Sequence, residues 1–411
     1  MIYDPKAYLQ SLLPVYKEEV ISGLNFWADH GIDWEKGGMV VYLDRQGNWF
    51  LDEKQGWFTG RGMYSFAKGY NDILQEPRWL EAALNLYDFM NAHQFAPNGK
   101  LYHHMNREGI PCRPDPRAGE WPSARGDGQS YGLHDESFAV MGLAELYKAT
   151  GREDIKASLY KMVELQQFIY HNPQYFPDGI KNPDEKAPKA GMGEYMSLLC
   201  SIQTARECDP ERKDYYTALL SEYVERAFEF YYDADKQLLY EREIECPGHS
   251  MEVAWFMLAE GLYTKNKALV NTCAQIIGNL FTLGWDPLYG GFNVFANVNG
   301  GPAFEINGNL KYWWPNNELE IGLMYSYIGT GDQKFLELYR RAHEWVFAHF
   351  PDREYGEWYG YLNHDGTPST YCKGDHSKGA YHLYRSFYAI YNLISAYLDH
   401  GDKFFTTDDK K

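Results

Sequence analysis

The sequence predicts an all-α protein folded as an (α/α)6 barrel, with short β-hairpins in the loops at the active-site end. Two observations support this prediction. Helical patterns recur along the whole chain, and they pair into helical hairpins with similar joints. One joint is Thr150-Gly151-Arg152-Glu153, and a near copy, Gly329-Thr330-Gly331-Asp332, follows much later. If the first and last elements pair, six helices that follow a loop and six that follow a tight turn make a closed ring.

The individual helices are indicated by apolar residues at helical spacing, bounded by turns rich in Gly, Pro and Asn. A helix at residues 8–28 opens the chain and another at 380–400 closes it. Between them lie five pairs: 57–70 with 78–93, 135–149 with 154–170, 193–208 with 214–231, 250–263 with 267–280, and 317–328 with 334–349. Gly-rich turns beside alternating residues at 37–47 and 98–109 predict the hairpins.

The length of 411 residues is compatible with one closed barrel. We therefore expect a single catalytic domain at residues 1–400, followed by a flexible tail at 401–411.

Composition excludes several classes of protein. A formal charge of −18 without a basic stripe argues against nucleic-acid binding. The sequence has no apolar run of membrane-spanning length, and its first residues lack the order of a signal peptide. Six scattered cysteines without a CxxC pair fit reduced thiols, so we expect a cytoplasmic protein. An aromatic content of 17% gives modest support to a cleft that binds sugars.

Candidate site residues follow from the barrel, because the loops that precede inner helices all emerge at one end. The candidates expected there are histidines, acids, an arginine, a lysine, tryptophans and a methionine: His249, His382, Glu252, Arg61, Trp57, Glu136, Met196, Trp313, Trp314, Glu318, His376 and Lys378. This set contains no metal-ligand pattern, and we expect no metal.

Residues 246–255 carry the clearest local signal. Pro247 and Gly248 place His249 near a helix N-terminus, and Glu252 shares its helical face, so the carboxylate can orient the imidazole. Each candidate also has a structural interpretation: His249 as a cap, the glutamates as acids favoured by helix dipoles, Arg61 as an ion-pair partner, and the tryptophans as core.

Several segments occur in an order that matches one family: 60–61, 135–138, 247–256, 284–287 with Gly290-Gly291, 311–318, 354–362 and 378–382. Over about residues 26–398 the chain resembles the N-acylglucosamine 2-epimerase family, whose vertebrate members were also described as renin-binding proteins. Cellobiose 2-epimerases are related to it.

This resemblance implies an (α/α)6 barrel and epimerisation at C2 of a reducing sugar, with His249 and His382 as the acid/base pair. It implies that Arg61 holds the sugar oxygens. N-acetylglucosamine and N-acetylmannosamine are the favoured substrates. Some relatives respond to a nucleotide, ATP, so an allosteric nucleotide and a homodimer are further expectations.

The chemistry requires a similar set of groups. Inversion at C2 of an open-chain sugar needs one base to remove the proton and an acid on the opposite face to return one. Imidazoles suit this task near neutral pH, and a guanidinium at Arg61 stabilises the enediolate. Glu252 would orient His249, and Glu318 would orient His382 or bind a hydroxyl. No cofactor is required.

Other substrates and functions remain open. Asp375-His376-Ser377 stands where the family carries a Gly-Pro-Phe-like segment, and a polar lining suits unsubstituted mannose, glucose, fructose or cellobiose. The same scaffold supports aldose–ketose isomerisation. The loop at 111–130, with Arg113, Arg117 and Arg125, is a further candidate for substrate contacts.

Two more distant alternatives belong to other classes of protein. A glycoside hydrolase on the same barrel would need a pair of carboxylates, for which Glu136 and Glu252 are candidates. A non-catalytic binding protein would exchange no solvent proton into any sugar.

Overall fold

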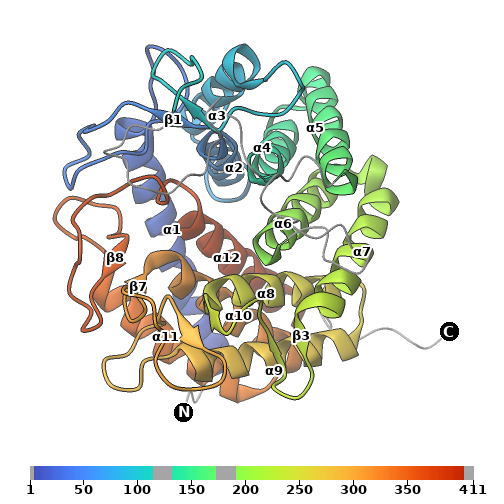
Figure 1. The fold of residues 1–411 in the computed structure, drawn as a ribbon, viewed down its shortest axis with the longest axis vertical. Coiled ribbons are helices and arrows are strands. Elements are labelled where there is room, and N and C mark those ends of the chain that lie inside the picture. Colours follow the sequence, from blue (N-terminus) through green and yellow to red (C-terminus); the bar gives the residue numbers. More distant parts are fainter. Residues whose placement is uncertain (1–3, 114–131, 173–190, 402–411) are drawn as a thin grey trace.

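A computed structural model of the protein describes residues 4–113, 132–172 and 191–401. Within these ranges the chain is mostly helical, and its named strands are two residues long. Arg117 and Arg125 of the predicted substrate loop lie outside the described residues, as does the predicted tail from residue 402 onward. The helices form two layers around a common axis (Figure 1).

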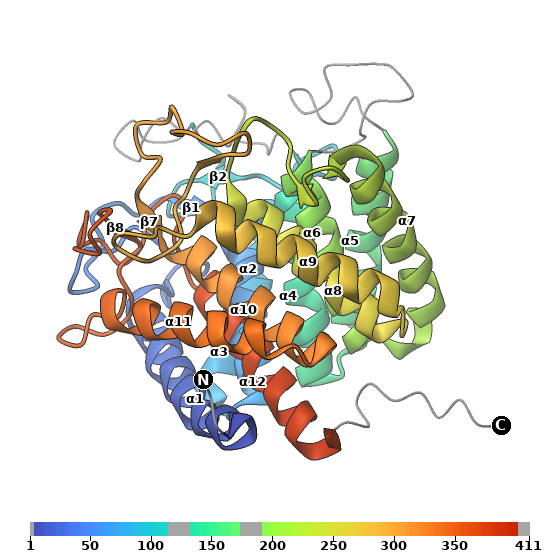
Figure 2. The same cartoon turned by 90° about the horizontal axis from the view of Figure 1, so that it is seen from below.

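The inner layer is a ring in which each helix packs against the next. Among the described residues, six helices build it: α2 (Gly56–Asp72), α4 (His134–Thr150), α6 (Met192–Cys208), α8 (Pro247–Tyr263), α10 (Trp313–Thr330) and α12 (His382–His400). The ring closes because α12 contacts both α10 and α2. Each inner helix up to α10 is followed by an outer helix that returns the chain, so the inner helices begin at the same end (Figures 1 and 2).

The outer layer places one helix against each inner helix. Its members are α1 (Pro5–His30), α3 (Pro77–Phe89, extended by a π-helical turn at Met90–Gln94), α5 (Glu153–His171), α7 (Lys213–Tyr231, after a 3-10 turn at Pro210–Arg212), α9 (Lys267–Gly284) and α11 (Gln333–His349). Helix α1 packs against α12, so the first and last elements do pair. The predicted (α/α)6 barrel is confirmed.

The two layers differ in burial as their sequences predict. Helix α10 buries every residue from 315 to 324, because it has neighbours on all sides. Helix α11 buries a single stripe made of Phe335, Leu336, Tyr339, Ala342 and Val346. An inner helix is therefore buried almost all round, and a polar residue on it needs a partner inside the protein.

The two similar joints of the sequence form the same structure. Gly151 and Gly331 end α4 and α10 in the left-handed conformation, with φ of 64° and 71°. Each glycine N–H donates to a tyrosine carbonyl one turn earlier, at 2.8 Å in both cases. The repeated Thr-Gly pattern therefore marks equivalent turns between an inner and an outer helix.

Short strand pairs join the loops at the end where inner helices begin. Strand β1 (Lys54–Gln55) pairs with β2 (His104–Met105), β5 (Ile244–Glu245) with β6 (Ala296–Asn297), and β7 (Lys311–Tyr312) with β8 (Tyr361–Leu362). Only β3 (Tyr232–Asp233) and β4 (Leu238–Leu239) form a local hairpin among the described residues. The turns expected at 37–47 and 98–109 are closed by single bridges, and the paired strands connect one loop with the next.

Two general expectations about the chain can be checked in the described ranges. None of the helices there combines the length and the apolarity needed to cross a bilayer. All six cysteines are unpaired thiols.

Candidate active site

The beginnings of the inner helices carry most of the predicted residues. His382 is the first residue of α12, Trp313 and Trp314 open α10, and His249 lies in the first turn of α8. Arg61 and Glu318 lie one turn deeper, on α2 and α10. Direct contacts, described below, connect these groups into one cluster.

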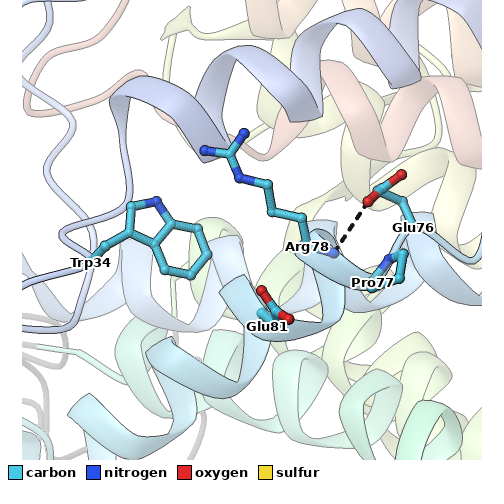
Figure 3. A pocket seen from close by; sticks show the side chains of 5 residues that line it. All are labelled: Trp34, Glu76, Pro77, Arg78 and Glu81. Carbon is cyan, nitrogen blue, oxygen red and sulfur yellow. Dashed lines mark hydrogen bonds between the residues drawn. The ribbon is translucent and has the colours of Figure 1, made fainter.

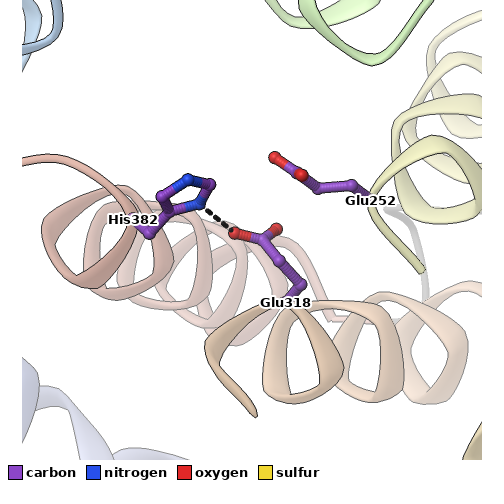
Figure 4. A group of neighbouring side chains, drawn as sticks. All are labelled: Glu252, Glu318 and His382. Atoms are coloured by element: carbon purple, nitrogen blue, oxygen red, sulfur yellow. Dashed lines mark hydrogen bonds and ion pairs between the residues drawn. The ribbon is translucent and has the colours of Figure 1, made fainter. Parts of the chain in front are cut away.

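Glu318 and His382 form the centre of the cluster. Nδ1 of His382 lies 3.0 Å from Oε1 of Glu318, and Nε1 of Trp255 donates to Oε2 of the same carboxylate at 2.8 Å. Both Glu318 and His382 are buried. Nη2 of Arg385, which only donates, also lies 3.3 Å from Nδ1, but the carboxylate is closer. Because a carboxylate only accepts, the Glu318 contact favours a proton on Nδ1 and a lone pair on Nε2. The predicted orienting role of Glu318 therefore has the geometry it needs (Figure 4).

Arg385 joins the two buried glutamates. Its Nη2 donates to Oε1 of Glu252 and to Oε1 of Glu318, and Nη1 donates to the Tyr381 hydroxyl at 2.8 Å. Burial opposes the charge on Arg385, but the two carboxylates outweigh it and raise the pKa of Arg385 well above its usual value. Burial raises the pKa of Glu318, and Arg385 opposes that rise. The guanidinium thus balances charge that the protein interior could not otherwise hold.

The Trp314 ring contacts both of the predicted catalytic histidines. Its ring is 4.8 Å from the His249 ring and 5.5 Å from the His382 ring, centroid to centroid, with interplanar angles of 34° and 37°. Desolvation is the largest cause that lowers the pKa of both histidines, and it lowers the pKa of His382 well below the usual value. Burial therefore favours the neutral form of both imidazoles.

Glu252 does not hydrogen-bond to His249, contrary to the expected orienting contact. Oε1 of Glu252 is taken by Arg385, and Oε2 is buried without a hydrogen-bond partner in the described ranges. The His249 ring likewise has no hydrogen-bond partner in the part of the chain that the structure describes. A full positive charge on Arg385 binds the carboxylate more strongly than a neutral imidazole does. Glu252 therefore acts on His249 only through its charge.

Arg61 is buried among aromatic rings. Its guanidinium carbon lies 4.1 Å from the Phe138 ring centroid, 4.6 Å from Trp57 and 4.7 Å from Tyr381. No carboxylate within the described ranges pairs with it, and its Nε has no hydrogen-bond partner there. Burial lowers the pKa of Arg61 to about 10, so it stays charged at neutral pH. It is a buried cation ready to bind oxygen atoms of a ligand.

The first turn of α4 holds Leu101 and His103 in place. Oε1 of Glu136 accepts from the backbone N–H of Leu101 at 3.0 Å, and Glu136 is fully buried. Burial raises the pKa of Glu136 to about 7. Next to it, Asp135 binds Nδ1 of His103. This geometry gives Glu136, predicted to bind substrate, a structural contact inside the protein.

The remaining predicted residues divide into those beside the cluster and those apart from it. Trp313 packs edge-on against His382, with centroids 6.2 Å apart, and Met196 is buried on the inner helix α6. Lys378 is buried in an ion pair, with Nζ 2.6 Å from Oε1 of Glu357. His376 is partly exposed in the loop before α12. The ammonium group of Lys378 also lies 5.9 Å from the Trp313 ring centroid, so Lys378 reaches the edge of the cluster while its charge is paired with Glu357.

The group of Glu252, Glu318 and His382 also has the spacing of a metal site, since one ligand atom from each lies within 4.8 Å of the others. Arg385, however, donates to both carboxylates. A divalent cation would have to share them with a fixed positive charge at hydrogen-bond distance, which costs electrostatic energy. The donor set therefore fits an internal ion network better than a metal.

Sequence reasoning missed two members of the cluster. Arg385 stands three residues after His382 and thus on the same face of α12, a spacing that could have identified it. Trp255 stands three residues after Glu252 in the same way. Neither residue was singled out, because their partners lie on other helices.

A separate hollow lies on the surface beside the start of α3. Trp34, Glu76, Pro77, Arg78 and Glu81 line it (Figure 3). Arg78 lies over the Trp34 ring at 5.7 Å and pairs with Asp29. None of the predicted site residues lines this hollow, so it is unrelated to the cluster.

Comparison with solved structures supports the barrel. A cellobiose 2-epimerase from Bacillus thermoamylovorans matches with a TM-score of 0.76 and 18% identity, covering 93% of this chain and 99% of that one. A D-mannose isomerase matches with a TM-score of 0.74 and 14% identity, covering 96% of this chain and 100% of that one. At these identities the likeness concerns the fold.

Comparison of sequences identifies the class. The chain matches, over residues 37–386, the family described as N-acylglucosamine 2-epimerase (GlcNAc 2-epimerase). It is 28% identical to the N-acylglucosamine 2-epimerase of Mus musculus, covering 94% of this chain and 93% of that relative. The protein is thus a carbohydrate epimerase, which is an isomerase. It belongs to the N-acylglucosamine 2-epimerase family.

Proposed function

We propose that the protein interconverts N-acetylglucosamine and N-acetylmannosamine, by moving the proton at C2 between His249 and His382. The observation that carries this proposal is the placement of both imidazoles against one indole, that of Trp314. Two bases packed on one aromatic residue lie near each other, as a carbon that must be attacked from both faces requires.

His382 serves as the base that takes the C2 proton. With Nδ1 donating to Glu318, its Nε2 carries the free lone pair. Its lowered pKa keeps it neutral and able to accept. Glu318 then stabilises the imidazolium that forms, because the carboxylate lies 3.0 Å from Nδ1.

His249 returns a proton on the opposite face. Its ring is partly exposed and packs on Trp314. The step balances when the pair holds one proton beyond its neutral state: His249 enters as an imidazolium and gives that proton to the sugar, while neutral His382 takes the proton from C2. The reverse reaction exchanges the two roles.

Arg61 stabilises the charge that develops between the two steps. Removal of the C2 proton gives an enediolate with negative charge on oxygen, and a buried guanidinium without a carboxylate partner in the described ranges can bind it. Arg385 is less suited to this role, because its charge is already paired with Glu252 and Glu318 through Nη2.

The N-acetylated substrates are supported by the sequence relatives. N-acylglucosamine 2-epimerases reach 28% identity, whereas the cellobiose 2-epimerase of Eubacterium cellulosolvens reaches 22%, over 86% of this chain and 91% of the relative. The polar residue Asp375 is also no obstacle to an acetamido group. Its Oδ1 accepts from the Tyr361 hydroxyl and from the backbone of Ser377 and Lys378, so it serves the loop itself.

The second candidate is an aldose–ketose isomerase or an epimerase of unsubstituted sugars. It is favoured by the fold shared with a D-mannose isomerase and by the partly exposed His376. The enediolate is common to both reactions, and return of the proton to C1 in place of C2 gives a ketose. A glycoside hydrolase is less well supported, because Glu252 and Glu318 share one guanidinium and Glu136 binds the Leu101 backbone.

We propose that residues 1–400 act as one catalytic domain, since the ring closes only with α1 and α12. The reaction needs no cofactor or metal, and a nucleotide such as ATP modulates it from another site. The protein works as a homodimer in the cytoplasm, a location that its unpaired cysteines favour.

The test is incubation with reducing sugars in deuterium oxide, followed by proton NMR of the C2 and C1 positions. We expect loss of the C2 proton signal and inversion with N-acetylglucosamine or N-acetylmannosamine. Label at C1 with a ketose product would support the second candidate. Absence of exchange with N-acetylated and plain hexoses would refute both.

A further inference from the structure

We infer that His103 and Asp135 are positioning residues, which hold Trp57 and through it Arg61 at the sugar site. They form a second buried imidazole–carboxylate pair, besides His382 and Glu318. This inference rests on the proposed function in one respect, that Arg61 and Trp57 meet the sugar.

The pair is well defined. Nδ1 of His103 lies 3.1 Å and 3.0 Å from the two carboxylate oxygens of Asp135. Only 2% of His103 and 1% of Asp135 is exposed. The His103 carbonyl also accepts from the backbone N–H of Gly56 at 2.7 Å. Side chain and backbone of His103 are thus both fixed, the first by α4 and the second by the start of α2.

The start of α2 lies directly against this pair. A Cβ atom at Gly56 would come within 2.6 Å of Oδ1 of Asp135 and 2.3 Å of the Tyr102 carbonyl oxygen. Only glycine permits this approach. The carboxylate therefore fixes where α2 begins, and Trp57 is the next residue.

Trp57 is held on several sides. Its ring meets the His103 ring edge-on, with centroids 5.1 Å apart and planes at 68°. Its Nε1 donates to Oε1 of Gln55 at 2.6 Å. On the same indole lies the Arg61 guanidinium, 4.6 Å from the ring centroid. A chain of contacts therefore runs from Asp135 through His103 and Trp57 to Arg61.

His103 acts through Trp57 and not on the sugar itself. Its Nε2 is buried and has no hydrogen-bond partner in the described ranges. Trp57, by contrast, is partly exposed. A ligand at this end of the barrel thus meets the indole first. Loss of the His103 contact would let Trp57 and Arg61 move, and small displacements of binding groups cost much in rate and affinity.

Two variants test separately the hydrogen bond of His103 to Asp135 and its ring contact with Trp57. His103→Asn keeps a donor for Asp135 but removes the ring that touches Trp57. His103→Phe keeps the ring but removes the hydrogen bond. The matched control is His343→Phe, since His343 on the outer helix α11 forms a similar but partly exposed pair, with Nδ1 2.9 Å from Oε1 of Glu320.

The readouts are kcat and KM for the sugar that the wild type turns over, and the apparent Kd of N-acetylmannosamine by titration calorimetry. We expect both His103 variants to raise KM and Kd about tenfold, with a smaller fall in kcat, while the control stays within twofold. The thermal midpoint of each variant shows whether the fold is kept.

Three results would overturn the inference. The first is KM and Kd within twofold of the wild type in both His103 variants. The second is a loss of kcat of about a thousandfold at unchanged KM, which would make His103 itself a proton-transfer group. The third is the finding that the wild-type protein does not bind any sugar. If the wild-type protein binds the sugar but exchanges no proton at C2, the proposed function is refuted. The inference about His103 and Asp135 would still be tested by the Kd of the variants.

Discussion

Oε1 of Glu318 lies 3.0 Å from Nδ1 of His382, although 64 residues separate them in the chain. Both side chains are buried, and each stands near the start of its inner helix. This contact favours a proton on Nδ1 and so leaves Nε2 of His382 to meet a substrate. It is the relationship on which the proposed direction of proton transfer depends most.

Substitution Glu318→Gln tests this contact. The neutral amide no longer stabilises an imidazolium at His382, so we expect kcat to fall about a hundredfold. The matched control is Glu320→Gln, two residues along the same helix, where Glu320 binds His343 in the outer layer. Steady-state kinetics of the two variants should differ strongly. Equal losses would show that Glu318 serves the fold alone.

The two histidines should each be essential for turnover. His249→Asn and His382→Asn remove a group that can exchange a proton with C2, and we expect a loss of about a thousandfold in deuterium exchange. Circular dichroism and the thermal midpoint should remain near those of the wild type. Exchange at close to the native rate in either variant would refute the two-histidine scheme.

The pH dependence of kcat/KM should reflect the lowered pKa of His382. Desolvation is the main cause of this shift, opposed by Glu252 and reinforced by Arg385. The ring accepts a proton only while it is neutral, and it becomes protonated as the pH falls through its pKa. We therefore expect the acid limb of the profile below pH 6.5, the usual value for histidine. A limb centred above pH 6.5, over a range in which the protein stays folded, would contradict the assignment.

Arg385 should matter for stability as well as for activity. Arg385→Met would leave Glu252 and Glu318 buried without their shared cation. We expect a loss of about 3–5 kcal/mol in the free energy of unfolding, measured by urea denaturation. The comparison is Arg340→Met on α11, whose partners Glu337 and Glu344 are more exposed. A loss below about 1 kcal/mol at Arg385 would mean that the carboxylates find other partners or become neutral.

Much of the architecture could be predicted from the chain. The Thr-Gly joints at Gly151 and Gly331 recur because equivalent turns need the same left-handed residue. Inner and outer helices differ in their apolar patterns because one kind is surrounded and the other is not. Helix boundaries were less accurate at the site: α10 begins at Trp313 and α8 at Pro247, earlier than expected.

The candidate site was predicted in part. His249, His382 and Glu318 could be placed at one end of the barrel because inner helices begin there. The pair of His103 and Asp135 was not predicted, since the two residues lie 32 positions apart on a loop and a helix. Lys378 was expected at the site, but its ammonium group pairs with Glu357.

The sequence by itself thus determined the barrel and the end at which polar groups gather, because both follow from local patterns repeated along the chain. Only the tertiary structure decided which carboxylate serves which cation. Glu252 stands one turn from His249 but binds Arg385, and Glu318 reaches across to His382. Partner choice in a buried cluster depends on charge and distance between separate helices, which spacing along one helix does not contain.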